Sequence, residues 1–333
     1  MLKQSSLDTL KAKKNLLAFS AGVDSSALFF LLHEQKINFD IAIVNYNTRE
    51  QSLEEVQYAH ELAKKYNLTC HTLNAPQITA NFEAKAREVR YAYFEEIITE
   101  HNYDTLLTAH HLGDRFEWML MQFCKGAGCV ELAGMKECEV RENYILLRPL
   151  LHVDKSELLT YLKSNAHKYF EDSTNKDENI LRNSFRKQHT QPLLQEYLNG
   201  IKKSFGYIDE DRALLAPEVQ IHACDTLKYF VSSDNRRADI VAIDSCLKQH
   251  GYLTTASEKN LLKKQTTLVL GRKYLVTKTN DYIFIAPFEE SSVVMSKEFK
   301  EECRILKIET KLRPYLYKQL HIFTKVKELL RNS

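Results

Sequence analysis

Apolar runs of strand length alternate with amphipathic stretches of helix length through the first half of the chain. Such alternation is typical of parallel strands joined by crossover helices, and it favours a parallel sheet flanked by helices, an α/β fold. Ligands of such sheets gather at the carboxyl ends of the strands. We expect strands at residues 15–19, 39–44, 68–73, 103–109 and 144–147, and helices near 25–34, 50–66, 81–101 and 113–124.

The pattern changes in the second half of the chain. A further helix is expected from Asp154, because Asp154 and Glu157 have the spacing of a capping box. The sequence is helical and charged from about residue 182 to 215, and Pro217 then precedes short helices and β-rich pieces. A chain of 333 residues exceeds one typical core. We therefore expect a catalytic domain at 1–216, with a helical linker from about 182, and a smaller α+β domain at 217–333.

Composition excludes several classes of protein. No apolar run reaches the roughly 20 residues of a membrane span, and the first residues lack an apolar signal core. We therefore expect a cytoplasmic protein with no membrane partner. The seven cysteines form no CxxC pair, which favours reduced structural thiols over a metal–thiolate site.

Basic residues gather in the last third of the chain, although the net charge of the whole is only +2. Residues 251–280 and 297–333 each carry a net charge of about +5. Such runs usually form a solvated helix face. Contact with a nucleic acid backbone is the alternative interpretation.

The first expected strand runs directly into a loop of small residues, followed by an apolar helix. The backbone N–H groups of such a turn, together with the helix N-terminus, bind anions. Asp24 in this loop would repel a phosphate, so we expect it to hold Mg²⁺ that bridges the phosphates of a nucleoside triphosphate. An N-capped turn without a ligand is the alternative. The loop comprises Ser20, Ala21, Gly22, Val23, Asp24, Ser25 and Ser26.

The sequence S-A-G-V-D-S of this loop resembles the SGGxDS loop of the N-type ATP-pyrophosphatases, or PP-loop proteins, which cleave ATP between the α and β phosphates. Residues 109–117 (A-H-H-L-G-D-R-F-E) resemble the AHHxDDxxE segment of tRNA(Ile)-lysidine synthases. Residues 125–128, 132–135 and 147–150 resemble that family's GSG, LAGM and RPL motifs, and 171–186 its EDSxNxD…RNxxR. The motifs occur in the family's order. The resemblance is strong over residues 13–190 and weaker over 235–286.

The resemblance implies a reaction. In the family, the C2 oxygen of the wobble cytidine in the CAU anticodon of an isoleucine tRNA attacks ATP and releases pyrophosphate. The ε-amine of free L-lysine then displaces AMP, which leaves lysidine in the tRNA. ATP and Mg²⁺ would be the cofactors, and tRNA and lysine the partners. The oligomeric state stays open, a homodimer included.

The resemblance also assigns residues. Asp114 and Glu117, three residues apart and so on one helix face, would bind the ammonium groups of lysine. Arg148, Arg182 and Arg186 would neutralise the charge of the departing pyrophosphate. A solvated, salt-bridged face is the alternative for both sets. His110, Asp172 and Asn175 would complete the lysine and cytidine region, and Lys263, Lys264, Arg272 and Lys273 would contact tRNA.

Three positions depart from the family pattern. Ala21 replaces a loop glycine, which we expect to be tolerated with a negative φ. Gly113 replaces the first aspartate of the DD pair, and Tyr46 replaces a histidine after the second strand. A tRNA-thiolating relative would need cysteines that are absent, and an amidotransferase an N-terminal cysteine or partner. A non-catalytic nucleotide-binding or RNA-binding relative remains an alternative.

Overall fold

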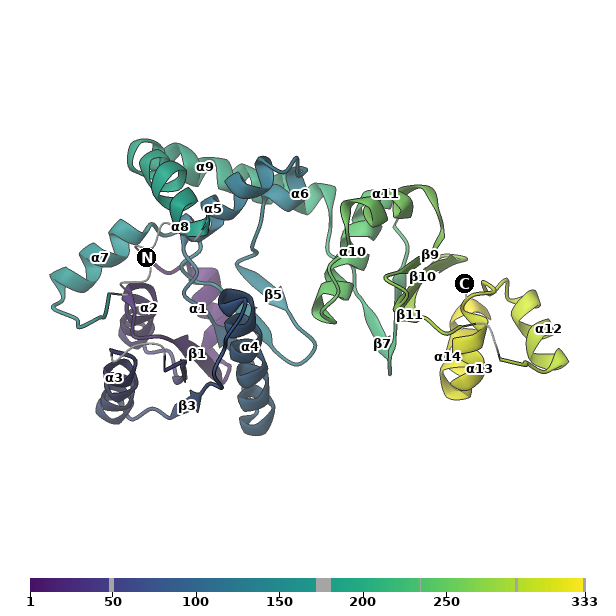
Figure 1. Cartoon of the computed structure of the whole chain (residues 1–333), viewed down its shortest axis with the longest axis horizontal. Coiled ribbons are helices and arrows are strands. Elements are labelled where there is room, and N and C mark those ends of the chain that lie inside the picture. The colour runs from purple at the N-terminus through teal and green to yellow at the C-terminus, as the bar shows by residue number, and fades with distance from the viewer. Residues whose placement is uncertain (48–50, 172–180, 234, 291–292, 332–333) are drawn as a thin grey trace. The chain divides into compact units, whose positions relative to one another are not determined.

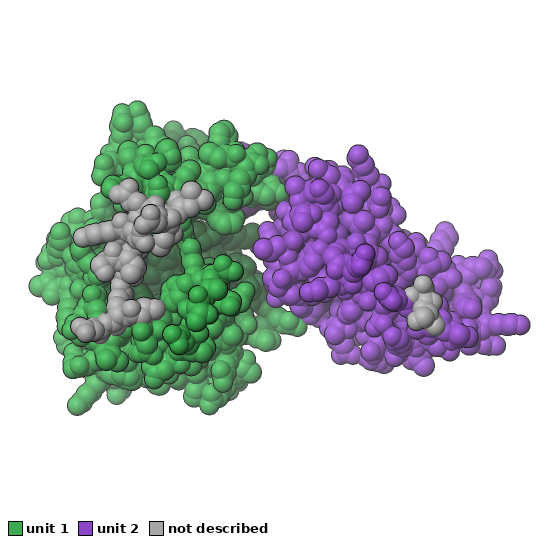
Figure 2. All heavy atoms as spheres, viewed as in Figure 1, with its two compact units in different colours: residues 1–209 green, residues 210–333 purple. Residues whose placement is uncertain are grey.

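The computed structural model describes residues 1–47, 51–171, 181–233, 235–290 and 293–331. The chain forms two compact units, Met1–Asp209 and Glu210–Ser333, coloured separately in Figure 2. This division lies within helix α9 (Gln191–Leu215), whereas the sequence placed a boundary at 217. Asp172 and Asn175 lie outside the described residues.

The first unit is built on a six-stranded sheet with the order β3-β2-β1-β4-β6-β5. Figure 1 labels β1, β3 and β5 of this sheet. Every neighbouring pair is parallel except β5 and β6. The expected parallel sheet is therefore confirmed, with β5 as an edge strand that the sequence did not predict. The strands are β1 (Asn15–Phe19), β2 (Phe39–Asn45), β3 (Cys70–Asn74), β4 (Thr105–Leu107), β5 (Cys138–Val140) and β6 (Ile145–Leu147).

Helices cover both faces of this sheet, which explains why its inner strands β1, β2, β4 and β6 are largely apolar, whereas the edge strands β3 and β5 are not. Leu17 and Phe19 of β1 pack with α2, α3 and α7 in one core, whereas Leu16 packs with α4 in the other. Helix α2 is buried on nearly all sides, and its Phe29 is fully enclosed. The helices are α1 (Gln4–Lys11), α2 (Val23–Glu34), α3 (Gln51–Tyr66), α4 (Phe82–His101), α5 (Leu112–Phe123), α6 (Cys129–Leu132), α7 (Lys155–Ser164), α8 (Leu181–Phe185), the π-helical turn η2 (Arg186–Thr190) and α9.

The second unit is a five-stranded antiparallel sheet with helices on both faces. Neighbouring residues of a strand alternate between the two cores, as the pleat requires. Phe230 packs with α10 and α11, whereas Tyr229 packs with α12, α13 and α14. The elements are β7 (His222–Cys224), β8 (Leu227–Val231), α10 (Arg236–Gln249), α11 (Ala256–Lys264), β9 (Thr267–Leu270), β10 (Tyr274–Thr279), β11 (Tyr282–Pro287), α12 (Lys297–Ile305), α13 (Arg313–Lys318) and α14 (Leu320–Arg331).

The strand order of the first unit explains why distant segments of the sequence meet. Strands β1, β4 and β6 are adjacent and parallel, so the residues that follow each of them emerge at the same edge of the sheet. These residues are the loop 20–26, the segment 108–111 and Arg148. Among the helices of the described residues, none combines the length and the apolar character that a membrane span needs.

Candidate functional site

The loop after β1 turns sharply into α2. Ala21 is wholly buried and has a φ of +55°, so the negative φ on which tolerance of alanine depended is not adopted. This left-handed conformation favours glycine, and a residue with a side chain adopts it at a cost of about 1 kcal/mol. The Oγ of Ser25 accepts a hydrogen bond from the Ser20 backbone, and Phe170 N donates to Ala21 O at 2.9 Å. The first N–H groups of α2 have no acceptor within the helix, which makes this turn suitable for an anion.

Asp24 lies in the first turn of α2. Its Oδ2 is 3.6 Å from Lys155 Nζ and 3.9 Å from His111 Nε2. Its Oδ1 is buried and has no hydrogen-bond partner among the described residues. An unpartnered carboxylate oxygen beside a phosphate-binding turn suits Mg²⁺, which typically takes one or two carboxylates together with phosphate oxygens and water. Within the described part of the chain, no three His, Cys, Asp or Glu residues gather as metal ligands.

His111 caps the helix that carries the predicted lysine ligands. Its Nδ1 accepts a hydrogen bond from Gly113 N at 3.0 Å, and its backbone N–H donates to Asp114 Oδ2 at 3.1 Å. Because Nδ1 is an acceptor, the neutral ring carries its proton on Nε2, which lies 3.6 Å from Asp114 Oδ2. The ring thus lies between the carboxylates of Asp24 and Asp114.

The glycine at 113 follows from this cap. A Cβ atom there would lie 2.7 Å from Cε1 of His111, so any side chain would displace the ring. The other departure, Tyr46, is accommodated differently. Its hydroxyl donates to Ala86 O at 2.9 Å, and its ring packs against Phe82.

His110 lies beside the cap, with Nδ1 2.9 Å from Thr108 Oγ1. Desolvation lowers the pKa of His110 to about 4; the attraction of Asp114 opposes this shift, and Arg148 adds to it. The imidazole is therefore neutral at neutral pH. A neutral ring can donate a hydrogen bond to a nucleobase, or accept one from it, without adding charge to the site.

Two carboxylates and two guanidinium groups form one cluster at the start of α5. We call Asp114, Glu117, Arg182 and Arg186 the carboxylate–arginine cluster. Arg186 donates from Nε to Glu117 at 2.7 Å and from a terminal nitrogen to Asp114 at 3.1 Å. Arg182 donates from Nε to Glu117 and lies 3.6 Å from Asp114. Asp114 and Glu117 therefore share one helix face, as predicted, and both are paired with arginines. Arg182 also pairs with a third carboxylate, that of Glu83, at 3.2 Å.

Burial and charge oppose each other in this cluster. Glu117 is 1% exposed, and a carboxylate so buried stays ionised only with partners. Burial alone would raise the pKa of Asp114, but His111, His110 and Arg186 hold that pKa well below its usual range. The Asp114 carboxylate is thus kept ionised at neutral pH despite its burial.

Arg148 is placed differently from the other two arginines. Its side chain is buried at the end of β6, where it donates to Lys136 O at 2.7 Å and to Glu139 at 3.1 Å. These contacts fasten β6 to the segment around β5. The expectation that Arg148, Arg182 and Arg186 face pyrophosphate stays a prediction. Each of the three guanidinium groups donates to a protein oxygen, whereas Nε of Arg148 is buried and has no hydrogen-bond partner among the described residues.

The residues predicted to contact tRNA lie in the second unit. Lys263 and Lys264 end α11, and Arg272 and Lys273 occupy the turn between β9 and β10. All four are exposed, and none has an ion pair with a described residue. Lys259 in the same run behaves differently, because it pairs with Asp244 at 3.0 Å.

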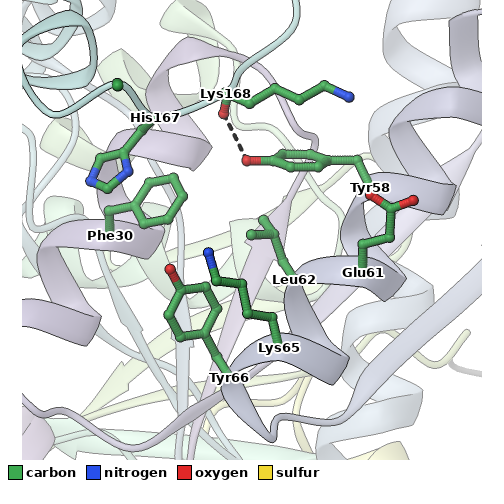
Figure 3. A pocket seen from close by; sticks show the side chains of 9 residues that line it. Phe30, Tyr58, Glu61, Leu62, Lys65, Tyr66, His167 and Lys168 are labelled. Atoms are coloured by element: carbon green, nitrogen blue, oxygen red, sulfur yellow. Dashed lines mark hydrogen bonds between the residues drawn. The ribbon is translucent and has the colours of Figure 1, made fainter.

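A hollow of about 300 Å³ lies elsewhere in the first unit, between α2, α3 and the segment after α7 (Figure 3). Tyr58 donates to Lys168 O at 2.8 Å across it, and His167 stacks on Phe30 with ring centroids 3.6 Å apart. None of the predicted site residues lines this hollow. It is lined by Phe30, Tyr58, Glu61, Leu62, Lys65, Tyr66, Ala166, His167 and Lys168.

Two residues near the loop were not among the predicted site residues. His111 lay inside the recognised A-H-H segment, but only contacts show which of the two histidines faces the carboxylates. Lys155 follows the predicted N-cap Asp154, a signal for a helix start that says nothing of where the lysine side chain points.

Comparison with known proteins gives three findings. The chain matches the family model of the PP-loop domain over residues 2–193. It is 41% identical to the tRNA(Ile)-lysidine synthase of Helicobacter pylori over 93% of this chain and 91% of that one, and 44% identical to that of Campylobacter jejuni over 95% and 96%. Among solved structures, it resembles the U34-tRNA thiolase NcsA from Methanococcus maripaludis with its 4Fe-4S cluster. The TM-score is 0.53 at 20% identity, over 66% of this chain and 80% of that one, which shows the fold alone.

Proposed function

We propose roles for the residues of this chain, which belongs to the tRNA(Ile)-lysidine synthase family and carries a PP-loop domain at residues 2–193. The chain is a ligase that forms lysidine on tRNA, and its PP-loop domain uses ATP. The specific substrates and the residue roles below are our proposal.

The reaction has two steps in this proposal. The C2 oxygen of the wobble cytidine, in the CAU anticodon of an isoleucine tRNA, attacks the α-phosphorus of ATP. The bond from that phosphorus to the bridging oxygen breaks, and its electron pair leaves with pyrophosphate. The ε-amine of free L-lysine then attacks C2. AMP leaves with the C2 oxygen, and the amine loses a proton.

The loop Ser20–Ser26 holds the ATP phosphates. The backbone N–H groups at the start of α2 and the hydroxyls of Ser20, Ser25 and Ser26 are its donors. Asp24 holds Mg²⁺, which would neutralise phosphate charge when bound. The buried, unpartnered Oδ1 of Asp24 supports this role.

The carboxylate pair binds lysine, and one observation carries this assignment. Asp114 and Glu117 lie at the same sheet edge as the loop, and both are paired with cationic groups of the protein. An ammonium group of lysine can replace a guanidinium there without changing the charge of the site. Arg182 and Arg186 hold the two carboxylates aligned until that exchange. His110, with Asp172 and Asn175, completes the cytidine and lysine region.

The exposed basic residues of the second unit contact tRNA phosphates in this proposal. Lys263, Lys264, Arg272 and Lys273 are exposed and have no ion pair with a described residue, so their charges are available to a polyanion.

The test is transfer of labelled lysine. Unmodified isoleucine tRNA with a CAU anticodon, ATP, Mg²⁺ and radiolabelled lysine should give label on the tRNA only when ATP is present. The same tRNA with a UAU anticodon, which has no wobble cytidine, should stay unlabelled. Absence of label from the first tRNA would favour a thiolating or non-catalytic relative, and ATP-independent label would exclude adenylation.

A further inference from the structure

We propose that Lys155 is a further catalytic residue, whose ammonium group binds the phosphates of ATP that leave as pyrophosphate. This inference rests on the proposed function, because it takes ATP to lie at the loop Ser20–Ser26. Three observations carry it: the position of Lys155, the engagement of the nearby arginines and the chemistry of its partner Asp24.

The backbone of Lys155 is firmly placed. Lys155 is the first residue of α7, directly after the N-cap Asp154, whose carboxylate accepts from Ser156 N at 2.9 Å. Glu157 completes the capping box by accepting from Asp154 N at 2.7 Å, and Lys202 of α9 holds Glu157 at 2.6 Å. From this fixed start of α7 the side chain reaches the N-terminus of α2, where Nζ is 3.6 Å from Asp24 Oδ2.

The arginines predicted for the phosphates are engaged elsewhere. Arg148 is buried against Glu139, and Arg182 and Arg186 are paired with Glu117 and Asp114. In the structure, both carboxylates have these guanidinium groups as partners. Among the described residues, Asp24 of the loop is the one acidic partner of Lys155. Unlike these three arginines, Lys155 can therefore move to phosphate without taking a partner from Glu139, Glu117 or Asp114.

A ligand can displace Lys155 from its contact with Asp24. The side chain of Lys155 is 40% exposed, and an ion pair of this length and exposure adds little to stability. With Mg²⁺ held by Asp24, the charge of the carboxylate would be offset by the metal, and the ammonium group of Lys155 would be free to turn on its flexible stem. A lysine ammonium is a compact point charge with three donors, which suits phosphate oxygens.

Lys155 keeps its proton throughout the step. The cytidine oxygen forms the new bond to the α-phosphorus, and the electron pair of the broken bond goes to the bridging oxygen. The ammonium group donates hydrogen bonds to the oxygens on which this charge develops, and so stabilises the transition state more than the bound substrate.

The experiment compares four variants of the full chain: Lys155→Ala, Lys155→Gln, Lys155→Arg and the control Lys163→Ala. Lys163 is an exposed lysine near the other end of the same helix. Three quantities are measured for each variant. They are the rate of pyrophosphate release as a function of ATP concentration, the KM for lysine at saturating ATP, and the melting temperature.

We expect Lys155→Ala and Lys155→Gln to raise the KM for ATP and to slow pyrophosphate release, together by about tenfold or more, as for loss of a hydrogen bond to a charged group. The KM for lysine and the melting temperature should not change, Lys155→Arg should recover part of the loss, and Lys163→Ala should match the wild type. Because Gln keeps most of the side-chain stem, it separates loss of charge from loss of packing.

Wild-type ATP kinetics in Lys155→Ala and Lys155→Gln would overturn the inference, as would a loss that Lys163→Ala shares. Asp24→Ala is run in parallel to separate this failure from failure of the proposed function. An active wild type, an inactive Asp24→Ala and a normal Lys155→Ala would reject only the role of Lys155. A wild type that releases no pyrophosphate with tRNA and ATP would reject the proposed function itself.

Discussion

Gly113 shows how one missing side chain shapes the site. The His111 ring occupies the space where a Cβ would lie, and this placement brings Nε2 between Asp24 and Asp114. Alanine would ordinarily strengthen a helix by about 0.5–1 kcal/mol over glycine. We therefore expect Gly113→Ala and Gly113→Asp to reduce kcat/KM for lysine transfer while leaving the melting temperature near the wild-type value. Steady-state kinetics and thermal unfolding check this, and a Gly113→Asp enzyme as active as the wild type would contradict it.

The carboxylate pair makes a prediction about lysine. Asp114→Asn and Glu117→Gln should each raise the KM for lysine by about tenfold or more, because each removes a charge-assisted hydrogen bond. The KM for ATP should change little, since the loop Ser20–Ser26 is untouched. Glu117→Gln should also lower the melting temperature, because Arg182 and Arg186 lose a buried partner. Lysine titrations at saturating ATP and tRNA measure this, with the exposed Glu96→Gln on α4 as control. If either variant kept the wild-type KM for lysine, the substituted residue would not be a lysine ligand.

Asp24 gives the corresponding prediction for the metal. Asp24→Ala should abolish lysine transfer and leave the fold intact, because the carboxylate is partly exposed and its two ion pairs are long. Circular dichroism melting verifies the fold and the labelled-lysine assay the activity. Full ATP-dependent transfer of lysine by this variant would contradict the assignment of Asp24 as a Mg²⁺ ligand.

Residue types and spacing predicted the carboxylates and the loop but not their partners. That Asp114 and Glu117 share a face follows from helical periodicity alone. That Arg182 and Arg186 lie on them could not be predicted, since the pairs are separated by 65 to 72 residues and depend on tertiary packing. The positive φ of Ala21 was also hidden, because alanine gives no local sign of a left-handed position.

At the scale of elements, Arg115 fastens α5 to its neighbours. This arginine is 5% exposed and makes a two-pronged ion pair with Asp209 of α9, at 2.9 and 2.6 Å. It also donates to Ala133 O and lies over the ring of Phe205. A buried cation is costly when its partner is removed, whereas an apolar replacement of similar volume often costs little.

We therefore expect substitutions of Asp209 and Arg115 to lower the free energy of unfolding by unequal amounts. Asp209→Ala should destabilise the first unit by about 3 kcal/mol, because it leaves the Arg115 charge buried, and Arg115→Met by about 1 kcal/mol or less. Urea unfolding followed by fluorescence of Trp118, the single tryptophan, reports on α5 directly. Equal losses, or a larger loss in Arg115→Met, would contradict this account.

The long elements were predictable and the short ones were not. Helices α2, α3, α4 and α5 start within two residues of their predicted bounds, because each is at least 12 residues long and has a clear apolar pattern. Helix α6 and strand β5 have four and three residues, too few to show a period. Helices α12 to α14 were read only as a basic run, although their apolar residues line a core of the second unit.

At the scale of the whole molecule, the two units divide the chemistry in our account. The first carries the loop and the carboxylate–arginine cluster, and the second carries the exposed basic residues. Length and the change of texture after residue 215 predicted two parts. In the structure the two compact units divide inside α9. The sequence could not predict this position, because a continuous helix gives no signal of where its contacts change.

The basic residues make a prediction about tRNA. Charge reversal of Lys263, Lys264, Arg272 and Lys273 to glutamate should weaken tRNA binding and reduce its salt dependence, because fewer counterions are released on binding. The KM for ATP should stay unchanged. The control reverses Lys11, Lys36, Lys64 and Lys163, four exposed lysines outside both basic runs. Filter binding across a series of salt concentrations measures the affinity for tRNA. If the affinity does not fall, or falls only as much as in the control, tRNA binds elsewhere.

The central claim is that the chain adenylates tRNA before lysine attacks. The direct measurement is transfer of label from α-³²P ATP to unmodified isoleucine tRNA without lysine, followed by addition of lysine. The account predicts labelled tRNA that depends on the wobble cytidine and loses its label as AMP once lysine is added, with an equal amount of lysine joined to the tRNA. Failure to label the tRNA, or label that lysine does not release, would contradict it.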